Sequence, residues 1–201
     1  MNNILRIDSS LFSEQGVSHQ LANELIENLT QLAPEATIIS RDLSKDDVPH
    51  LDAARISAIS TAPDARTEAQ QAMVAYSDQL IAEAQAADAL VIGAPMYNFS
   101  VPSVLKAWFD HIARAGVTFS YTSEGPKGHL ENKTAYVITT RGGQHKDQPS
   151  DTLVPYVKNM LAFVGITDVR VIYAEGLNMG GGAREQGIDS ARQEIQQALV
   201  A

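Results

Sequence analysis

The chain has 201 residues, no cysteine and a formal net charge of −9. This length suits one large domain that buries most of its apolar surface, so we expect residues 1–201 to form a single domain. The lack of cysteine excludes disulfides, thiolate catalysis and iron–sulfur clusters, while the acidic balance argues against a nucleic-acid surface. No stretch is long and apolar enough for a membrane span, which predicts a cytoplasmic protein.

Apolar runs of strand length alternate with segments of helical period along the whole chain. The expected strands are Asn3–Ile7, Thr37–Ser40, Ala89–Ala94, Ala135–Thr139 and Asp168–Ala174. Five helices are expected. The first has Leu21, Leu25, Leu29 and Leu32 on one face, and the second, from about Thr67 to Gln85, points Met73, Leu80 and Ile81 inward. The third ends near Ala113, the fourth spans Thr152–Val164, and the last carries Ile188, Ile195 and Leu199 at helical spacing.

Two stretches fall outside this alternation. Residues 42–62 are expected to be irregular, and a glycine-containing excursion leads from Gly116 to Leu130. The remaining strand–helix alternation predicts an α/β fold with a doubly wound parallel sheet and right-handed crossovers. Ligands of such sheets bind beyond the carboxyl ends of the strands, so the loops after the first, third and fourth strands should converge.

The third expected strand runs directly into a loop with unusual side chains. The strand has no polar alternation, which is typical of a central parallel strand covered on both faces. Pro95 ends its pairing, and Pro102 presets the first turn of the next helix. Between them lies the segment Met96-Tyr97-Asn98-Phe99. Aromatic faces, an amide and unpaired backbone N–H groups suit a flat ligand with a polar edge.

The loops after the first and fourth strands carry further candidate binding residues. Ser9-Ser10 and Gly16-Val17-Ser18 precede the first helix, where free N–H groups and the helix dipole can hold a phosphate; an ordinary helix cap by Ser18 is the alternative. Thr140-Arg141-Gly142-Gly143 brings bare backbone to a position where it could approach a planar ring, or is simply a turn.

Several long, collinear segments resemble one family over essentially the whole chain. They are Ser9-Ser10, APMYNF at residues 94–99, KAWFDHIARAGVTF at 106–119, RGGQHKDQPSD at 141–151, FVGITDV at 163–169 and AEG at 174–176. These segments resemble the FMN-dependent NADH:quinone oxidoreductases of the azoreductase family. The resemblance implies a flavodoxin-like fold of five parallel strands in three layers, α/β/α, and a homodimer with one FMN per subunit.

The resemblance also implies which residues bind the cofactor. By the resemblance, the residues that bind the phosphate group are Ser10, Gly16, Val17 and Ser18. Those that bind the ring are Met96, Tyr97, Asn98, Phe99, Thr140, Arg141, Gly142 and Gly143. Family members often carry Ser-Gln where this chain has Gly16-Val17, so side-chain hydrogen bonds from those two positions are lost. The implied reaction is a two-electron ping-pong transfer from NADH or NADPH through FMN to a quinone or an aromatic azo compound.

Four residues are candidates for the substrate cavity in view of the resemblance. Phe119, Tyr121 and Phe163 could wall it because aromatic acceptors stack on aromatic side chains, but Phe119 and Phe163 could equally be core residues. His145 could donate to a substrate or lie on a solvated loop. Quinone and azo reduction can take protons from water, so no side chain is assigned as a catalytic acid.

An apolar stripe on the third expected helix bears on assembly. It is wider than one helix needs for a single sheet face, which predicts that part of it meets a second copy in a homodimer. The stripe consists of Val101, Leu105, Trp108, Phe109 and Ile112.

A metal enzyme, an electron carrier and a sensing module are the alternatives to an FMN-dependent oxidoreductase. The five histidines show no metal-ligand spacing, so no metal is expected. A flavodoxin-like electron carrier would bind FMN through similar loops but would lack a substrate cavity, and a non-catalytic module that senses flavin or quinone state would not turn over NADH. The choice between NADH and NADPH stays open, with Arg55, Arg66, Arg141 and Arg184 as possible partners of a 2′-phosphate.

Overall fold

A parallel sheet forms the centre of the molecule. The computed structural model describes residues 1–200. Its five-stranded sheet has the order β2-β1-β3-β6-β7, and all neighbouring strands are parallel. The winding reverses between β1 and β3, as in flavodoxin-like sheets, so the predicted fold class is confirmed. The strands are β1 (Asn3–Asp8), β2 (Thr37–Asp42), β3 (Ala89–Gly93), β6 (Thr134–Thr140) and β7 (Asp168–Ala174).

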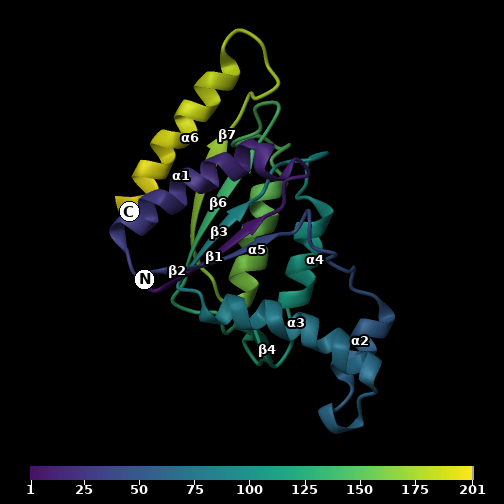
Figure 1. The fold of residues 1–201 in the computed structure, drawn as a ribbon. Helices are drawn as coiled ribbons and strands as arrows, with labels where there is room; N and C mark the ends of the chain where they lie inside the picture. Colours follow the sequence, from purple (N-terminus) through teal and green to yellow (C-terminus); the bar gives the residue numbers. More distant parts are fainter. Residues whose placement is uncertain (201) are drawn as a thin grey trace.

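Helices cover both faces of the sheet (Figure 1). Along β1, Ile4 belongs to the core under α1 and α6, whereas Leu5 and Ile7 belong to the core under α3, α4 and α5, because successive strand residues point to opposite faces. Two hydrophobic cores therefore lie on either side of the sheet in a three-layer architecture. The helices are α1 (Val17–Leu32) and α6 (Ala183–Val200) on one face, and α3 (Glu68–Ala86), α4 (Ser103–Ile112) and α5 (Leu153–Val164) on the other.

Residues 42–62 contain a helix, so the prediction that they are irregular was wrong in part. Helix α2 (Ala53–Ser60) begins after Asp52, whose side chain accepts a hydrogen bond from the Arg55 amide at 2.8 Å. This contact is an ordinary N-cap, which satisfies one of the free amides at the start of the helix. Packing of α2 against α3 then holds a helix that is too short to be stable alone.

Two apolar residues predicted to face inward do not. Leu32 ends α1 and is 66% exposed. Met73 is only partly buried, and Val74, the next residue, takes its place in the core. The buried positions of α3 continue from Val74 through Ser77 to Leu80 and Ile81, so the helical phase was misplaced by one residue at its start.

The excursion between Gly116 and Leu130 forms an antiparallel hairpin of β4 (Phe119–Thr122) and β5 (Gly125–Gly128), which sequence patterning did not predict. The hairpin packs on the end of α5, where the Leu130 amide donates to the Val164 carbonyl at 2.8 Å. Because α5 runs back from the carboxyl edge and β7 begins directly after it, the hairpin lies at the amino edge of the sheet (Figure 1).

The apolar stripe at α4 is buried within the chain itself. Its members are at most 7% exposed, so the expectation that part of the stripe is left for a second copy was wrong: α3 and α5 flank α4 and bury its sides as well as its sheet-facing surface. These residues are Val101, Leu105, Trp108, Phe109 and Ile112. Within residues 1–200, none of the helices combines the length and hydropathy that crossing a membrane requires.

Candidate functional site

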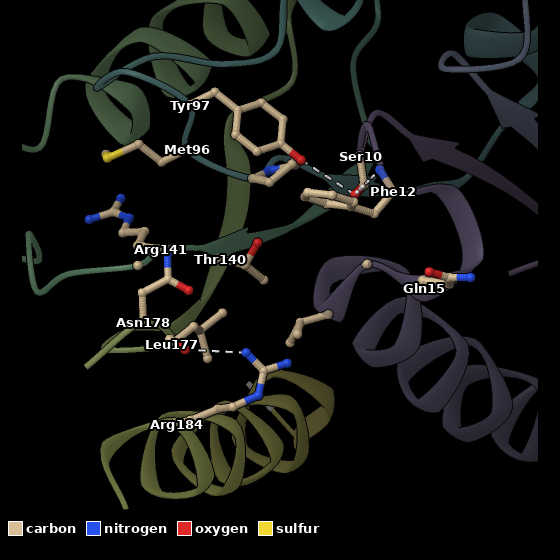
Figure 2. A pocket seen from close by; sticks show the side chains of 14 residues that line it. Ser10, Phe12, Gln15, Met96, Tyr97, Thr140, Arg141, Leu177, Asn178 and Arg184 are labelled. Carbon is tan, nitrogen blue, oxygen red and sulfur yellow. Dashed lines mark hydrogen bonds between the residues drawn. The ribbon is translucent and has the colours of Figure 1, made fainter. Parts of the chain in front are cut away.

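A pocket of about 260 Å³ opens at the carboxyl edge of the sheet (Figure 2). The loops after β1, β3 and β6 meet there, and the loop after β7 with the start of α6 supplies a further wall. Of the residues predicted to bind the cofactor, eight line this pocket, namely Ser10, Gly16, Val17, Met96, Tyr97, Thr140, Arg141 and Gly142. The others, Ser18, Asn98, Phe99 and Gly143, do not contribute to its lining.

The first turn of α1 presents free amides at this pocket. Gly16 is the N-cap residue and no side chain caps the helix, so the alternative of an ordinary Ser18 cap does not hold. The Gln20 amide donates to the Gly16 carbonyl at 3.1 Å, whereas the amides of Val17, Ser18 and His19 have no acceptor within residues 1–200. Unpaired N–H groups at the positive end of a helix dipole form an anion site.

Bare backbone at Gly16 keeps this site open. A Cβ atom at Gly16 would collide with the Ser10 hydroxyl. The Ser10 Oγ accepts from the Phe12 amide at 3.2 Å and lies 3.4 Å from the Tyr97 hydroxyl (Figure 2). The Tyr97 hydroxyl in turn accepts from the Leu11 amide at 3.2 Å. The Tyr97 hydroxyl thus ties the loop after β3 to the loop after β1.

The loop after β3 holds two residues in an unusual backbone conformation. Asn98 has φ 50° and Phe99 has φ 66°, and the Tyr97 and Ser100 backbones pair across them. Asparagine tolerates left-handed φ, but phenylalanine rarely adopts it, and such strain concentrates at binding sites. The Phe99 ring is 56% exposed and stands edge-on to the ring of His145, with centroids 5.7 Å apart. His145 therefore lies beside the loop that bounds the pocket.

Backbone hydrogen bonds lock the loop after β6 to the loop after β7. The amides of Gly176, Leu177 and Asn178 donate to the carbonyls of Gly143, Arg141 and Gly142 at 2.9 to 3.0 Å. A Cβ atom at Gly142 would lie 2.6 Å from Asn178 Nδ2, so only glycine leaves room for this amide side chain. Gly142 presents bare backbone and Asn178 presents an amide to the pocket, which suits a planar ring with a polar edge.

The Arg141 side chain is occupied inside the protein. Its guanidinium is fully buried, 2.7 Å from Asp151 and 3.2 Å from Glu175, and its carbon Cζ lies 5.0 Å from the centre of the Tyr173 ring. Burial raises the pKa of Tyr173 to about 12, with a further contribution from Asp151. Because the Arg141 charge is balanced by two carboxylates, this side chain fixes the loop and is unavailable to a 2′-phosphate.

Sequence reasoning did not assign the rest of the pocket wall to cofactor binding. Four of these residues are exposed, namely Phe12, Gln15, Asn178 and Arg184. The loop after β7 could have been found, because the carboxyl ends of all parallel strands share one edge and the AEG segment precedes it directly. The residues not assigned are Phe12, Gln15, Pro95, Leu177, Asn178 and Arg184.

The aromatic residues predicted to wall the substrate cavity lie elsewhere in the same chain. Phe119 is only 6% exposed and packs on Phe163, with ring centroids 4.2 Å apart, while Tyr121 is 75% exposed. They belong to the hairpin and to the end of α5, at the edge opposite to the pocket. Across residues 1–200, no group of three or more histidine, aspartate and glutamate side chains is arranged to hold a metal ion.

Comparison with known proteins agrees with this geometry. Residues 2–199 match a family model described as a flavodoxin-like fold. The chain is 53% identical to an FMN-dependent NADH:quinone oxidoreductase of Cellvibrio japonicus over 201 residues, all of both chains. It is 50% identical to one of Alcanivorax borkumensis over 193 residues, which cover 96% of this chain and 98% of the relative.

Solved structures extend the comparison. An azoreductase of Bacillus anthracis superposes over the whole of both chains with a TM-score of 0.90 and 28% identity. An FMN-dependent NADH-azoreductase of the same species, solved in complex with FMN, gives a TM-score of 0.89 and 26% identity over 100% of this chain and 98% of the other. The chain therefore belongs to the flavodoxin-like family of FMN-dependent NADH:quinone oxidoreductases and azoreductases.

Proposed function

We propose that this chain is an FMN-dependent NADH:quinone oxidoreductase and azoreductase in which residues 1–201 act as one FMN-binding domain in the cytoplasm. The observation that carries the proposal is the set of unpaired amides of Val17, Ser18 and His19 in the first turn of α1, which begins in the same pocket that the bare backbone of Gly142 lines. A phosphate and a planar ring on one ligand match these two features. The names of the relatives, at about half identity over the whole chain, support the same activity.

The residues proposed to hold FMN follow from this match. Backbone amides of the first turn of α1 bind the phosphate group, with the Ser10 hydroxyl beside them. The loops after β3 and β6 enclose the ring, and the Asn98 amide meets its polar edge. The proposed set is Ser10, Gly16, Val17, Ser18, Met96, Tyr97, Asn98, Phe99, Thr140, Arg141, Gly142 and Gly143.

The protein's part in the reaction is binding, orientation and exclusion of water. FMN, when bound, supplies the two-electron redox chemistry, with NADH or NADPH as donor. The Tyr97 hydroxyl, which accepts from the Leu11 amide, holds the loop after β3 to the loop after β1, beside the phosphate site. Arg141 acts as a positioning residue through its buried ion pairs, and Gly142 leaves space for a ring to approach the backbone. Water supplies the protons, so no catalytic side chain is proposed.

Purified protein should bind about one FMN per chain and oxidise NADH with a quinone or azo dye as acceptor. If donor and acceptor use one site in turn, double-reciprocal plots at several acceptor concentrations should be parallel. The measurement is anaerobic stopped-flow mixing with each nucleotide, followed by mixing with quinones and azo dyes. A colourless protein that takes up no FMN would refute the proposal, and negligible NADH oxidation without a partner reductase would favour the electron carrier instead.

We further propose that the enzyme is a homodimer. Tyr121 is exposed on the hairpin at the edge opposite to the pocket of its own chain, so a substrate role for it requires the pocket of a second copy. The same requirement applies to Phe119, whose ring meets that of Tyr121 edge-on, and to Phe163, which packs on Phe119. His145 instead meets Phe99, on the loop after β3 of its own chain, edge-on.

Analytical ultracentrifugation at micromolar concentration is expected to give the mass of a dimer. Tyr121→Ala should raise the KM for quinone and leave the FMN content unchanged, because Tyr121 is not among the residues proposed to hold FMN. Glu124→Gln, on the turn of the same hairpin, is the matched control with unchanged kinetics. A fully active monomer would rule out both the dimer and the shared site.

A further inference from the structure

The charge of the pocket lining contrasts with that of the whole chain. The chain carries a formal net charge of −9, yet the lining contains two arginines, Arg141 and Arg184, and no acidic residue. The Arg141 guanidinium is buried between Asp151 and Glu175, so its charge is already balanced. Arg184 has no carboxylate partner among residues 1–200 and leaves the pocket with one uncompensated positive charge.

Arg184 also stands where a cation is unfavourable for the helix that carries it. It is the second residue of α6, whose N-terminus bears the positive end of the helix dipole. Glu185 in the same turn suits the dipole, but Arg184 itself makes no ion pair within residues 1–200, and a charge placed against a local preference indicates a role outside the fold itself. The same helix carries Arg192 in an ordinary surface arrangement, paired with Glu24 and Asp189.

The orientation of the side chain is fixed by one hydrogen bond. Arg184 Nη1 donates to the Leu177 carbonyl at 3.2 Å, which directs the guanidinium into the space between α6 and the loops of the pocket (Figure 2). Its remaining N–H groups have no acceptor within residues 1–200. A planar fork with free donors is well suited to two phosphate oxygens.

We infer that Arg184 binds the phosphate group of FMN together with the first turn of α1. Arg184 lines the same pocket as Gly16 and Val17, where the helix with the free amides begins, so an anion held by those amides shares the pocket with the guanidinium on the neighbouring helix α6. Backbone amides carry only partial charges, and a phosphate near pH 7 carries about −1.5 to −2, so a full positive charge adds stabilisation that the amides cannot supply. The inference rests on the proposed function.

Binding of FMN and of riboflavin to the apoprotein tests the role, with flavin fluorescence as the readout. Because the side chain is exposed, Arg184→Gln should raise the Kd for FMN about fivefold in low salt. Riboflavin, which lacks the phosphate, should bind equally to both proteins. The difference in Kd for FMN between wild type and Arg184→Gln should become smaller as the salt concentration rises from about 0.05 M to about 0.5 M, since exposed charges are screened. Arg192→Gln is the matched control on the same helix and should leave both affinities unchanged.

Each contrary result for Arg184→Gln points to a different role of the side chain. An equal loss for riboflavin would mean that Arg184 supports the ring or the fold, and thermal unfolding of the apoprotein would separate these two. Unchanged FMN affinity would overturn the inference, and a raised KM for NADPH but not NADH would then assign Arg184 to the 2′-phosphate of the donor. Wild-type apoprotein that takes up no FMN would overturn the proposed function as well.

Discussion

Replacing Arg141 with leucine is expected to lower the free energy of unfolding by about 3 to 5 kcal/mol, because it leaves two largely buried carboxylates without their counter-charge. Asp151 and Glu175 are 7% and 17% exposed at their side chains, so water compensates for only a small part of the loss. Glu175 retains the amides of His145 and Lys146 as donors at 2.6 and 2.9 Å, whereas Asp151 retains only the Val154 amide at 3.2 Å. Urea denaturation of the apoprotein measures the effect.

Two further variants isolate the cause of that destabilisation. Arg141→Leu combined with Asp151→Asn should recover part of the lost stability, since the least satisfied charge is then removed. Arg192→Leu removes an arginine with two exposed carboxylate partners and should cost less than about 1 kcal/mol. Equal losses for the buried and the exposed arginine would contradict the argument from burial.

Val17→Pro is expected to weaken FMN binding by roughly 10- to 100-fold, the value of one hydrogen bond to a charged group. Proline removes the Val17 N–H, which has no acceptor within residues 1–200, and it fits the first helical position without distorting α1. Gly16 already has ψ 138°, the extended conformation that a residue before proline prefers. Titration of the apoprotein with FMN measures the loss.

Val17→Ala is the control for this variant. It shortens the same side chain, which packs on the core under α1, but keeps the amide, so its FMN affinity should stay close to that of the wild type. Circular dichroism of both apoproteins should show equal helix content. If the proline and alanine variants bind FMN equally well, the phosphate lies away from the first turn of α1.

The central strand and its loop could be predicted because their signals are local. A run of apolar residues from Ala89 onward with no polar alternation specifies a strand buried on both faces, and Pro95 marks its end. Convergence of the loops after β1, β3 and β6 then follows from the geometry of parallel sheets rather than from any one residue.

The hairpin and the turn that aims Arg184 at the pocket could not be predicted, since their signals depend on tertiary contacts. Gly128 packs against Gly165, a residue that is distant in the sequence, and this approach pins the hairpin to α5. Gly181 and Gly182 look like a flexible connection, yet both adopt positive φ and turn the chain so that Arg184 faces the pocket. In α4, apolar periodicity predicted which face is buried. It did not predict that the whole stripe is buried within one chain, because that depends on α3 and α5 covering both flanks of the helix.

The pocket draws its walls from nearly the full span of the chain, from Ser10 to Arg184. During synthesis, the loops after β1 and β3 leave the ribosome long before the wall that follows β7. The three amide donors of Gly176, Leu177 and Asn178 also have to arrive before the Gly142 loop is fixed. Loading of the cofactor is thus a late event, which follows completion of the chain and cannot template its early folding.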